Sequence, residues 1–246
     1  LYGLFYEDIN YAADGGLYAE LVQNRSFEYY PVGGSRPGRD MTPLFAWEKV
    51  ERGDGACTLS VESSEPLNAN NPHYVRLAIE TPGEGVGLAN LGFDGIPVAK
   101  GETCAFSVYA RRTGSLDAPV RISLRGETGQ LGQAEIGPLT PQWAQYEARI
   151  PVTESDERAH LVLVTTGEGE LFLDMISLFP GTTFKGRKNG LRADLAQALA
   201  DLKPATFRFP GGCVVHGNGL DNAYRWKDTV GDVAQRRPNW NRWGYH

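Results

Sequence analysis

The sequence predicts an α/β unit that is split by an inserted all-β domain. Two short apolar strands are expected, at 1–9 and at 206–209, and each stops at a polar or glycine-rich turn. The block 37–180 between them has a different texture, in which short alternating strands are separated by turn residues. Outside this block a strand, a helix and a second strand follow one another, which is the rhythm of a parallel sheet or a (β/α) barrel.

The first expected strand, 1–9, is nearly continuous apolar sequence, which is typical of a strand that is buried on both faces. Its last residues, from Glu7 onward, are expected to reach a loop. Gly15-Gly16 then breaks the chain. Apolar residues after this pair recur at helical spacing, so we predict a helical turn over 17–24.

Six strands are predicted inside the block 37–180, with clusters of glycine, proline and polar residues between them. Many short antiparallel strands without a helix of any length are typical of a two-sheet sandwich or jelly roll. The predicted strands are 74–80, 103–111, 120–125, 145–150, 159–165 and 171–178.

The α/β pattern resumes after the block. Apolar residues three or four positions apart between 189 and 202 predict one amphipathic helix, which Pro204 ends. The segment 206–209 is the next strand, and Pro210-Gly211-Gly212 makes a sharp exit from it. Because consecutive strands of such a unit usually lie side by side, we expect 1–9 and 206–209 to pair in parallel.

Composition excludes several classes of function. The net charge of -6 argues against a nucleic-acid surface, which needs clustered Lys and Arg facing phosphates. No apolar run approaches the ~20 residues that span a bilayer, and no basic-then-apolar leader precedes Leu1, so we expect no membrane partner. The abundant glycine and aromatic residues instead suit turn-rich β-structure with rings in a core or against sugars.

Cysteine and histidine give no sign of a metal site. Cys57, Cys104 and Cys213 cannot all pair within one chain, and no C-x-x-C spacing is present. The redox compartment is therefore undecided. His216 and His246 have no nearby Glu-His or His-His spacing, so neither is read as a metal ligand.

Four groups of residues follow one another along the chain in a specific order. They are Tyr2-Gly3-Leu4-Phe5-Tyr6-Glu7-Asp8-Ile9-Asn10, then Gly15-Gly16-Leu17-Tyr18-Ala19-Glu20-Leu21 with Asn24-Arg25-Ser26-Phe27-Glu28, then Arg208-Phe209-Pro210-Gly211-Gly212-Cys213, and then Trp226-Lys227-Asp228-Thr229-Val230-Gly231 with Arg237-Pro238 and Trp243-Gly244-Tyr245. Together they resemble the start of α-L-arabinofuranosidases of glycoside hydrolase family 51. The inserted block, which contains Asn90-Leu91-Gly92-Phe93-Asp94-Gly95-Ile96, is similar to the carbohydrate-binding-module-like jelly roll of a subgroup of these enzymes. The resemblance covers essentially the whole chain.

The resemblance implies a division of the chain into three parts. Residues 1–36 would start a (β/α)8 TIM barrel, 37–180 would form an inserted, galactose-binding-like jelly roll, and 181–246 would continue the barrel. Because such a barrel needs ~250 residues, the barrel parts of this chain cannot close one.

The resemblance also implies an activity. It is that of a retaining, exo-acting enzyme that removes terminal arabinofuranosyl units from arabinoxylan, arabinan or related oligosaccharides. Retention needs two carboxyl groups ~5 Å apart, and no cofactor. In the family these glutamates follow the fourth and seventh barrel strands, whereas this chain stops just beyond the second. Both are therefore expected beyond His246.

Three residues are substrate-binding candidates by the same resemblance. Glu7 matches a glutamate that hydrogen-bonds hydroxyls of the bound furanose, a task for which a charged acceptor is suited. Its alternative role is a structural ion pair with Arg208. Cys213 occupies the position of an Asn or Cys beside the sugar, or else is a small buried hydrophobe. Trp243 matches a tryptophan that borders the substrate, or else fills a core.

The inserted block carries aromatic residues that could face a sugar. Most of them fall within alternating strand patterns, so we expect most in the sandwich core rather than on a binding face. The loops show no calcium-ligand pattern specific enough to assign. The residues are Trp47, Tyr74, Phe93, Tyr109, Trp143 and Tyr146.

Two rival functions remain at this stage. One is a non-catalytic carbohydrate-binding protein whose jelly roll is the functional part, and the other is a barrel glycosidase with different sugar specificity. An Asn-Glu pair beyond position 246 in the parent gene would favour an enzyme over a binding module. A plant-polymer substrate makes an extracellular or periplasmic location the expectation, and the full-length enzyme is a candidate homo-oligomer.

Overall fold

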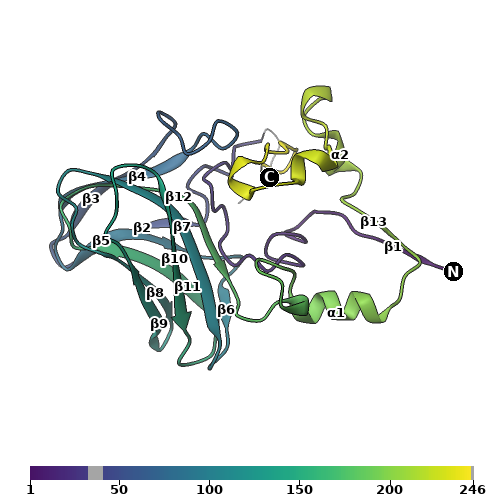
Figure 1. Cartoon of the computed structure of the whole chain (residues 1–246), viewed down its shortest axis with the longest axis horizontal. Coiled ribbons are helices and arrows are strands. Elements are labelled where there is room, and N and C mark those ends of the chain that lie inside the picture. The colour runs from purple at the N-terminus through teal and green to yellow at the C-terminus, as the bar shows by residue number, and fades with distance from the viewer. Residues whose placement is uncertain (33–40, 245–246) are drawn as a thin grey trace.

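The computed structural model describes residues 1–32 and 41–244, and these residues form mostly β-structure (Figure 1). Eleven strands, β2 to β12, make up a two-sheet unit. The segments before and after it run together beside this unit, where they carry a short strand pair, β1 and β13, and the helix α1 (Figure 1).

The two-sheet unit consists of two antiparallel sheets. The first has the order β10-β7-β12-β4-β3, and the second has the order β2-β5-β11-β8-β9 with β6 also pairing with β11. The strands are β2 (Trp47–Arg52), β3 (Ala56–Glu62), β4 (Tyr74–Thr81), β5 (Gly85–Asn90), β6 (Ile96–Val98), β7 (Thr103–Thr113), β8 (Val120–Gly126), β9 (Gly129–Ile136), β10 (Ala144–Pro151), β11 (Asp156–Thr165) and β12 (Gly169–Phe179).

One apolar core holds the two sheets face to face. Alternate residues of each strand point into it, as expected for sheets that pack against each other. Val108 of β7 and Leu173 of β12 meet Ile122 of β8 and Leu163 of β11 in the same buried cluster. Two facing antiparallel sheets are what the predicted sandwich requires, and the finer description as a jelly roll stays a prediction.

All six strands predicted in the block are confirmed, as β4, β7, β8, β10, β11 and β12, each within a few residues of the expected bounds. Five further strands were missed. In β2 and β9, charged residues or glutamine and glycine interrupt the apolar pattern, and β5 reads as glycine-rich although all six of its residues are buried. β6 has three residues, of which the middle one is Pro97.

The parallel strand pair is confirmed. β1 (Gly3–Phe5) pairs in parallel with β13 (Thr206–Arg208), with Leu4 opposite Phe207. The expectation that the first strand is buried on both faces is wrong for this structure, because the sheet has two strands here and its aromatic residues stay open. Phe5 is 56% exposed and Phe207 is 44% exposed.

The predicted amphipathic helix is confirmed in a shorter form, α1 (Ala193–Asp201). It ends before Pro204, as expected. Its apolar stripe is only partly covered, since Ala196 is buried whereas Leu195 is 38% exposed. Five further short helical segments complete the fold of the described residues. They are η1 (Phe184–Gly186), α2 (Cys213–His216), η2 (Leu220–Asn222), η3 (Trp226–Thr229) and η4 (Val233–Gln235).

The helical turn predicted over 17–24 is wrong. This segment is an extended loop, and the carboxylate of Glu20 accepts the backbone N–H groups of Leu21 and Val22, both at 3.1 Å, which a helix would have directed to its own carbonyls. The helical spacing of the apolar residues instead reflects packing of Leu21 and Val22 against the two-sheet core.

Buried carboxylates fasten this loop to the first sheet. Glu20 also accepts bonds from Ser177 Oγ at 2.6 Å and from the Leu178 N–H at 2.9 Å, both in β12. Glu28 accepts the N–H of His73 at 2.8 Å. Because both carboxylates are almost completely buried, these bonds fix where the loop lies relative to the sheet.

Candidate functional site

Glu7 lies just beyond the end of β1 and is held by the turn that follows β13. Its Oε1 accepts the backbone N–H groups of Gly212 at 3.1 Å and Cys213 at 3.3 Å. The strand pairing continues past the strands themselves, because the Asp8 N–H donates to the Pro210 carbonyl at 3.0 Å. The expectation that Glu7 and Cys213 meet at one end of the parallel pair is therefore confirmed.

Arg208 does not take part in this contact. Its guanidinium carbon lies 4.6 Å from the ring centroid of Phe5, in a cation–π arrangement. Within the described part of the chain, no ion pair joins Arg208 to Glu7. No contact in the described residues therefore supports a structural ion pair of Glu7 with Arg208. The Glu7 carboxylate is bound to neutral backbone donors instead.

Gly211 makes the close approach of Glu7 to this turn feasible. Its φ is +118°, in the region that favours glycine, and a Cβ there would lie 2.4 Å from Cγ of Glu7. Gly212 is different, since nothing lies within 4 Å of the place where its Cβ would be. The Gly-Gly pair therefore contains one glycine that the site requires and one that it does not.

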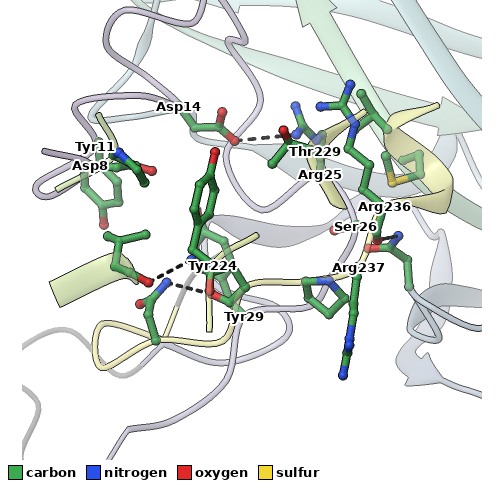
Figure 2. Close-up of a pocket in the computed structure, with 18 of the residues that line it drawn as sticks. Asp8, Tyr11, Asp14, Arg25, Ser26, Tyr29, Tyr224, Thr229, Arg236 and Arg237 are labelled. Carbon is green, nitrogen blue, oxygen red and sulfur yellow. Dashed lines mark hydrogen bonds and ion pairs between the residues drawn. The ribbon is translucent and has the colours of Figure 1, made fainter. Parts of the chain in front are cut away.

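A cavity of about 250 Å³ opens next to this turn. Its lining starts one residue beyond Glu7, at Asp8, and includes Pro210 and Val214, which lie on either side of Cys213. The two-sheet unit contributes Asn71 and Met175. Figure 2 shows Asp8 and Tyr11 on one side of the cavity, with Arg25 and Arg236 on the other.

Charged side chains of both signs line the cavity. Arg25 lies between two carboxylates, with Asp14 Oδ2 at 3.8 Å and Glu20 Oε2 at 3.3 Å, and Figure 2 marks the contact with Asp14. Arg236 donates from Nε and Nη2 to the Gly231 carbonyl, at 3.2 and 2.9 Å. Such a wall offers fixed donors and acceptors, which suits a ligand rich in hydroxyl groups.

Asp8 is a cavity residue whose pKa is shifted toward neutral pH. Burial raises its pKa to about 6, and the negative charge of Asp14 adds to the increase, while a hydrogen bond from the Ala13 N–H at 3.0 Å opposes it. Near neutral pH this carboxyl therefore changes its charge inside a wall that also contains Asp14 and Arg25.

We expect Asp8→Asn to stabilise the chain near neutral pH. An aspartate whose folded-state pKa lies above the unfolded value of 3.8 favours folding below that value, and this contribution is lost as the pH rises through about 6. Asparagine mimics the protonated form and keeps an acceptor for Ala13. Urea unfolding should show a gain of about 1 kcal/mol at pH 7.5 and almost none at pH 4. An equal effect at both pH values would contradict the assignment.

Trp243 lies in a small aromatic cluster with Tyr29 and Met41, against which Tyr11 and Phe45 also pack. Tyr11 and Tyr29 line the cavity, whereas Trp243 is not among its lining residues. Glu7 and Cys213 are not among the lining residues either. The structure therefore brings Glu7 and Cys213 together beside the cavity and packs Trp243 against residues that line it.

Sequence reasoning did not single out several cavity residues, namely Asp8, Arg25, Asn71 and Arg236. Asp8 had one available signal, because it follows Glu7 directly at the end of the first strand. Asn71 lies in the inserted block, more than 160 positions from Arg236, whose carbonyl it contacts. Nothing in the local sequence of either residue indicates that contact.

The aromatic residues of the inserted block divide into two groups. Trp47 and Tyr74 are buried, and the other four are half-buried, so the expectation that most lie in the core is wrong. Trp143 packs edge-on against Tyr74 at 5.3 Å, and the Arg111 guanidinium stacks on Phe172 at 4.0 Å. Trp143 is thus engaged by another aromatic side chain of the same block.

The three cysteines are free thiols, with Cys57 and Cys104 buried and Cys213 half-buried. Within residues 1–32 and 41–244, no group of three or more His, Cys, Asp or Glu side chains is placed to hold a metal ion. No helix in the same ranges is long and apolar enough to cross a membrane.

Comparison with known proteins gives consistent matches. A family model described as an alpha-L-arabinofuranosidase 1 domain matches residues 198–246. An extracellular exo-alpha-L-arabinofuranosidase of Streptomyces chartreusis is 40% identical over 100% of this chain, and alpha-L-arabinofuranosidase 1 of Arabidopsis thaliana is 35% identical over 96% of it. The chain spans 29% and 34% of the length of these two relatives.

A solved structure is similar along the whole chain as well. It is that of an arabinose-bound GH51 α-L-arabinofuranosidase, with a TM-score of 0.84 and 34% sequence identity. The similarity covers 100% of this chain and 39% of the other.

Proposed function

Because the chain belongs to glycoside hydrolase family 51, whose α-L-arabinofuranosidases it matches as their N-terminal portion, we propose that it is the start of an enzyme that removes terminal α-L-arabinofuranosyl units. The observation that carries the proposal is Glu7, whose carboxylate is fixed at the end of the parallel strand pair by two backbone N–H groups. A fixed, charged acceptor beside a cavity whose lining includes charged side chains is suited to vicinal sugar hydroxyls.

In this proposal β1 and β13 are the first two strands of a (β/α)8 barrel. Residues 1–36 and 181–246 belong to the barrel, and 37–180 form an inserted domain. The parallel pairing of β1 with β13, and the position of α1 between them in the chain, support this arrangement. Their exposed aromatic faces are surfaces that further strands and helices would cover.

The three candidate residues take separate roles in this pocket. Glu7 accepts hydrogen bonds from the terminal sugar, Cys213 lies beside the sugar, and Trp243 borders it through the loop it stabilises. The mechanism is retaining, with the two catalytic glutamates in the part of the enzyme beyond His246. Arabinoxylan, arabinan and their oligosaccharides are the proposed substrates, and secretion is proposed because the Streptomyces relative is described as extracellular.

A comparison of the full-length enzyme with residues 1–246 alone tests this proposal. The full-length protein should hydrolyse an aryl α-L-arabinofuranoside, whereas the purified chain 1–246 should show no hydrolysis above background, because it lacks the carboxyl pair. Turnover by 1–246 would overturn the placement of the catalytic residues. An inactive full-length protein that still binds arabino-oligosaccharides would favour the rival, a non-catalytic carbohydrate-binding protein.

A further inference from the structure

We propose that Asn70 and Asn71, in the turn before β4, are positioning residues. They hold the segment 234–241, called the wall below, in the shape that receives the part of the substrate next to the terminal sugar. This inference rests on the proposed function and assigns to the two-sheet unit a share in substrate selection. The unit would then act through the pocket itself rather than as a separate glycan-binding module.

The contact between the turn and the wall is direct. Asn71 donates from Nδ2 to the carbonyls of Ala234 at 2.9 Å and Arg236 at 3.1 Å, and Asn70 donates to the carbonyl of Gln235 at 2.8 Å. Three consecutive carbonyls of the wall are therefore bound by two neighbouring side chains. Asn71 is 4% exposed and Ala234 is also 4% exposed, so water does not compete freely for these bonds.

The turn that presents these two side chains is itself fixed. The Asn70 N–H donates to Oδ1 of Asn68 at 2.9 Å, and the Asn71 N–H donates to the carbonyl of Asn68 at 3.1 Å. Three residues later the chain enters β4, a strand in the interior of the first sheet. The donors thus have a rigid base in the two-sheet unit.

The wall has little regular structure of its own. Apart from the short helical turn η4, the segment 234–241 is irregular, and it depends on side chains from elsewhere. Its other end is bound by Asn222, which donates to the Pro238 carbonyl at 3.0 Å, and by Tyr30, which bonds Asn241. Losing Asn71 would leave two carbonyls without their donor and would free one end of the wall.

The position of this wall suggests which part of the substrate it receives. The cavity starts beside the turn that holds Glu7, and Arg236, Asn239 and Asn241 of the wall line it. In this proposal, the group attached to a terminal sugar bound at Glu7 extends into this space. A wall held in place before binding needs no ordering when a large substrate arrives, so its loss should weaken the binding of large substrates most.

The test uses the full-length enzyme and two substrates, an arabinoxylo-oligosaccharide and an aryl arabinofuranoside. For Asn71→Ala we expect KM for the oligosaccharide to rise about tenfold with kcat nearly unchanged, and both constants for the aryl substrate to stay within about twofold. Asn70→Ala, which removes one bond at an exposed position, should change KM in the same direction by a smaller factor. Hydrogen exchange of the amides in 231–241 should become faster in both variants.

Ser155→Ala serves as the matched control. It removes the Oγ that accepts a hydrogen bond from the Lys100 N–H at 2.9 Å, a bond of the two-sheet unit that involves no residue of the wall. Equal losses on both substrates, or unchanged exchange in 231–241, would overturn the proposal, and Asn70→Ala decides the matter if Asn71→Ala does not fold. A wild-type enzyme that cleaves neither substrate would refute the proposed function, while the exchange data would still report on the contact.

Discussion

Glu7→Gln in the full-length enzyme is expected to lower kcat/KM for terminal arabinofuranosides by roughly 10- to 150-fold, which corresponds to about 1.5–3 kcal/mol of lost hydrogen bonding to sugar hydroxyls. Glutamine keeps the shape of the side chain and one carbonyl oxygen, so it can still accept the N–H groups of Gly212 and Cys213. What it loses is the charge that strengthens bonds to the substrate.

Steady-state kinetics together with thermal unfolding separate this role from a structural one. The melting temperature of Glu7→Gln should stay close to that of the wild type, because the bonds of Glu7 to the turn are to neutral donors and no ion pair with Arg208 is broken. Arg208→Met is the control for a structural ion pair between Glu7 and Arg208. If Glu7→Gln has unchanged kcat/KM, or simply unfolds, the sugar-binding role is wrong.

Alternation of an apolar and a polar face accounts for part of the strand prediction only, because β11 and β12 were predicted although they are buried over most of their length, and the alternating β3 was missed. β7 is the clearest case of alternation, since Cys104, Phe106 and Val108 are buried and the residues between them are half-buried. β5 lies between β2 and β11 and is buried throughout, but its Gly-Val-Gly sequence carries no period-two signal. The loop 17–24 shows the opposite failure, because the buried Glu20 overrides an apolar spacing that fits a helix.

The candidate site was predictable only where local sequence determines it. The ends of adjacent parallel strands must meet, and this places Glu7 beside Cys213 although the two residues are 206 positions apart in the sequence. The cavity wall does not follow from such a rule. The bond from Asn71 to Arg236 depends on how the two-sheet unit sits on the strand pair, and this in turn depends on buried contacts such as that of Glu20 with Ser177.

We expect Gly211→Ala to lower kcat/KM by roughly 100-fold, because displacing a binding group by about 1 Å can cost that much. The new Cβ would be only 2.4 Å from Cγ of Glu7 and 2.8 Å from its Oε1, and the φ of +118° is one that alanine rarely adopts. The turn, the Glu7 carboxylate or both must move. The carboxylate would then lose the two N–H donors that fix its position.

Gly212→Ala is the control that the chain itself offers. It adds the same methyl group one residue further on, where nothing lies within 4 Å and φ is -97°, and it retains the N–H that donates to Glu7. Its kcat/KM should stay within about twofold of the wild type, since neither strain nor a clash arises. A combination with Glu7→Gln provides a second check: if Gly211→Ala acts by displacing Glu7, the double variant should lose little more than the worse single variant. Additive losses would mean that Gly211 affects activity by a route that does not pass through Glu7.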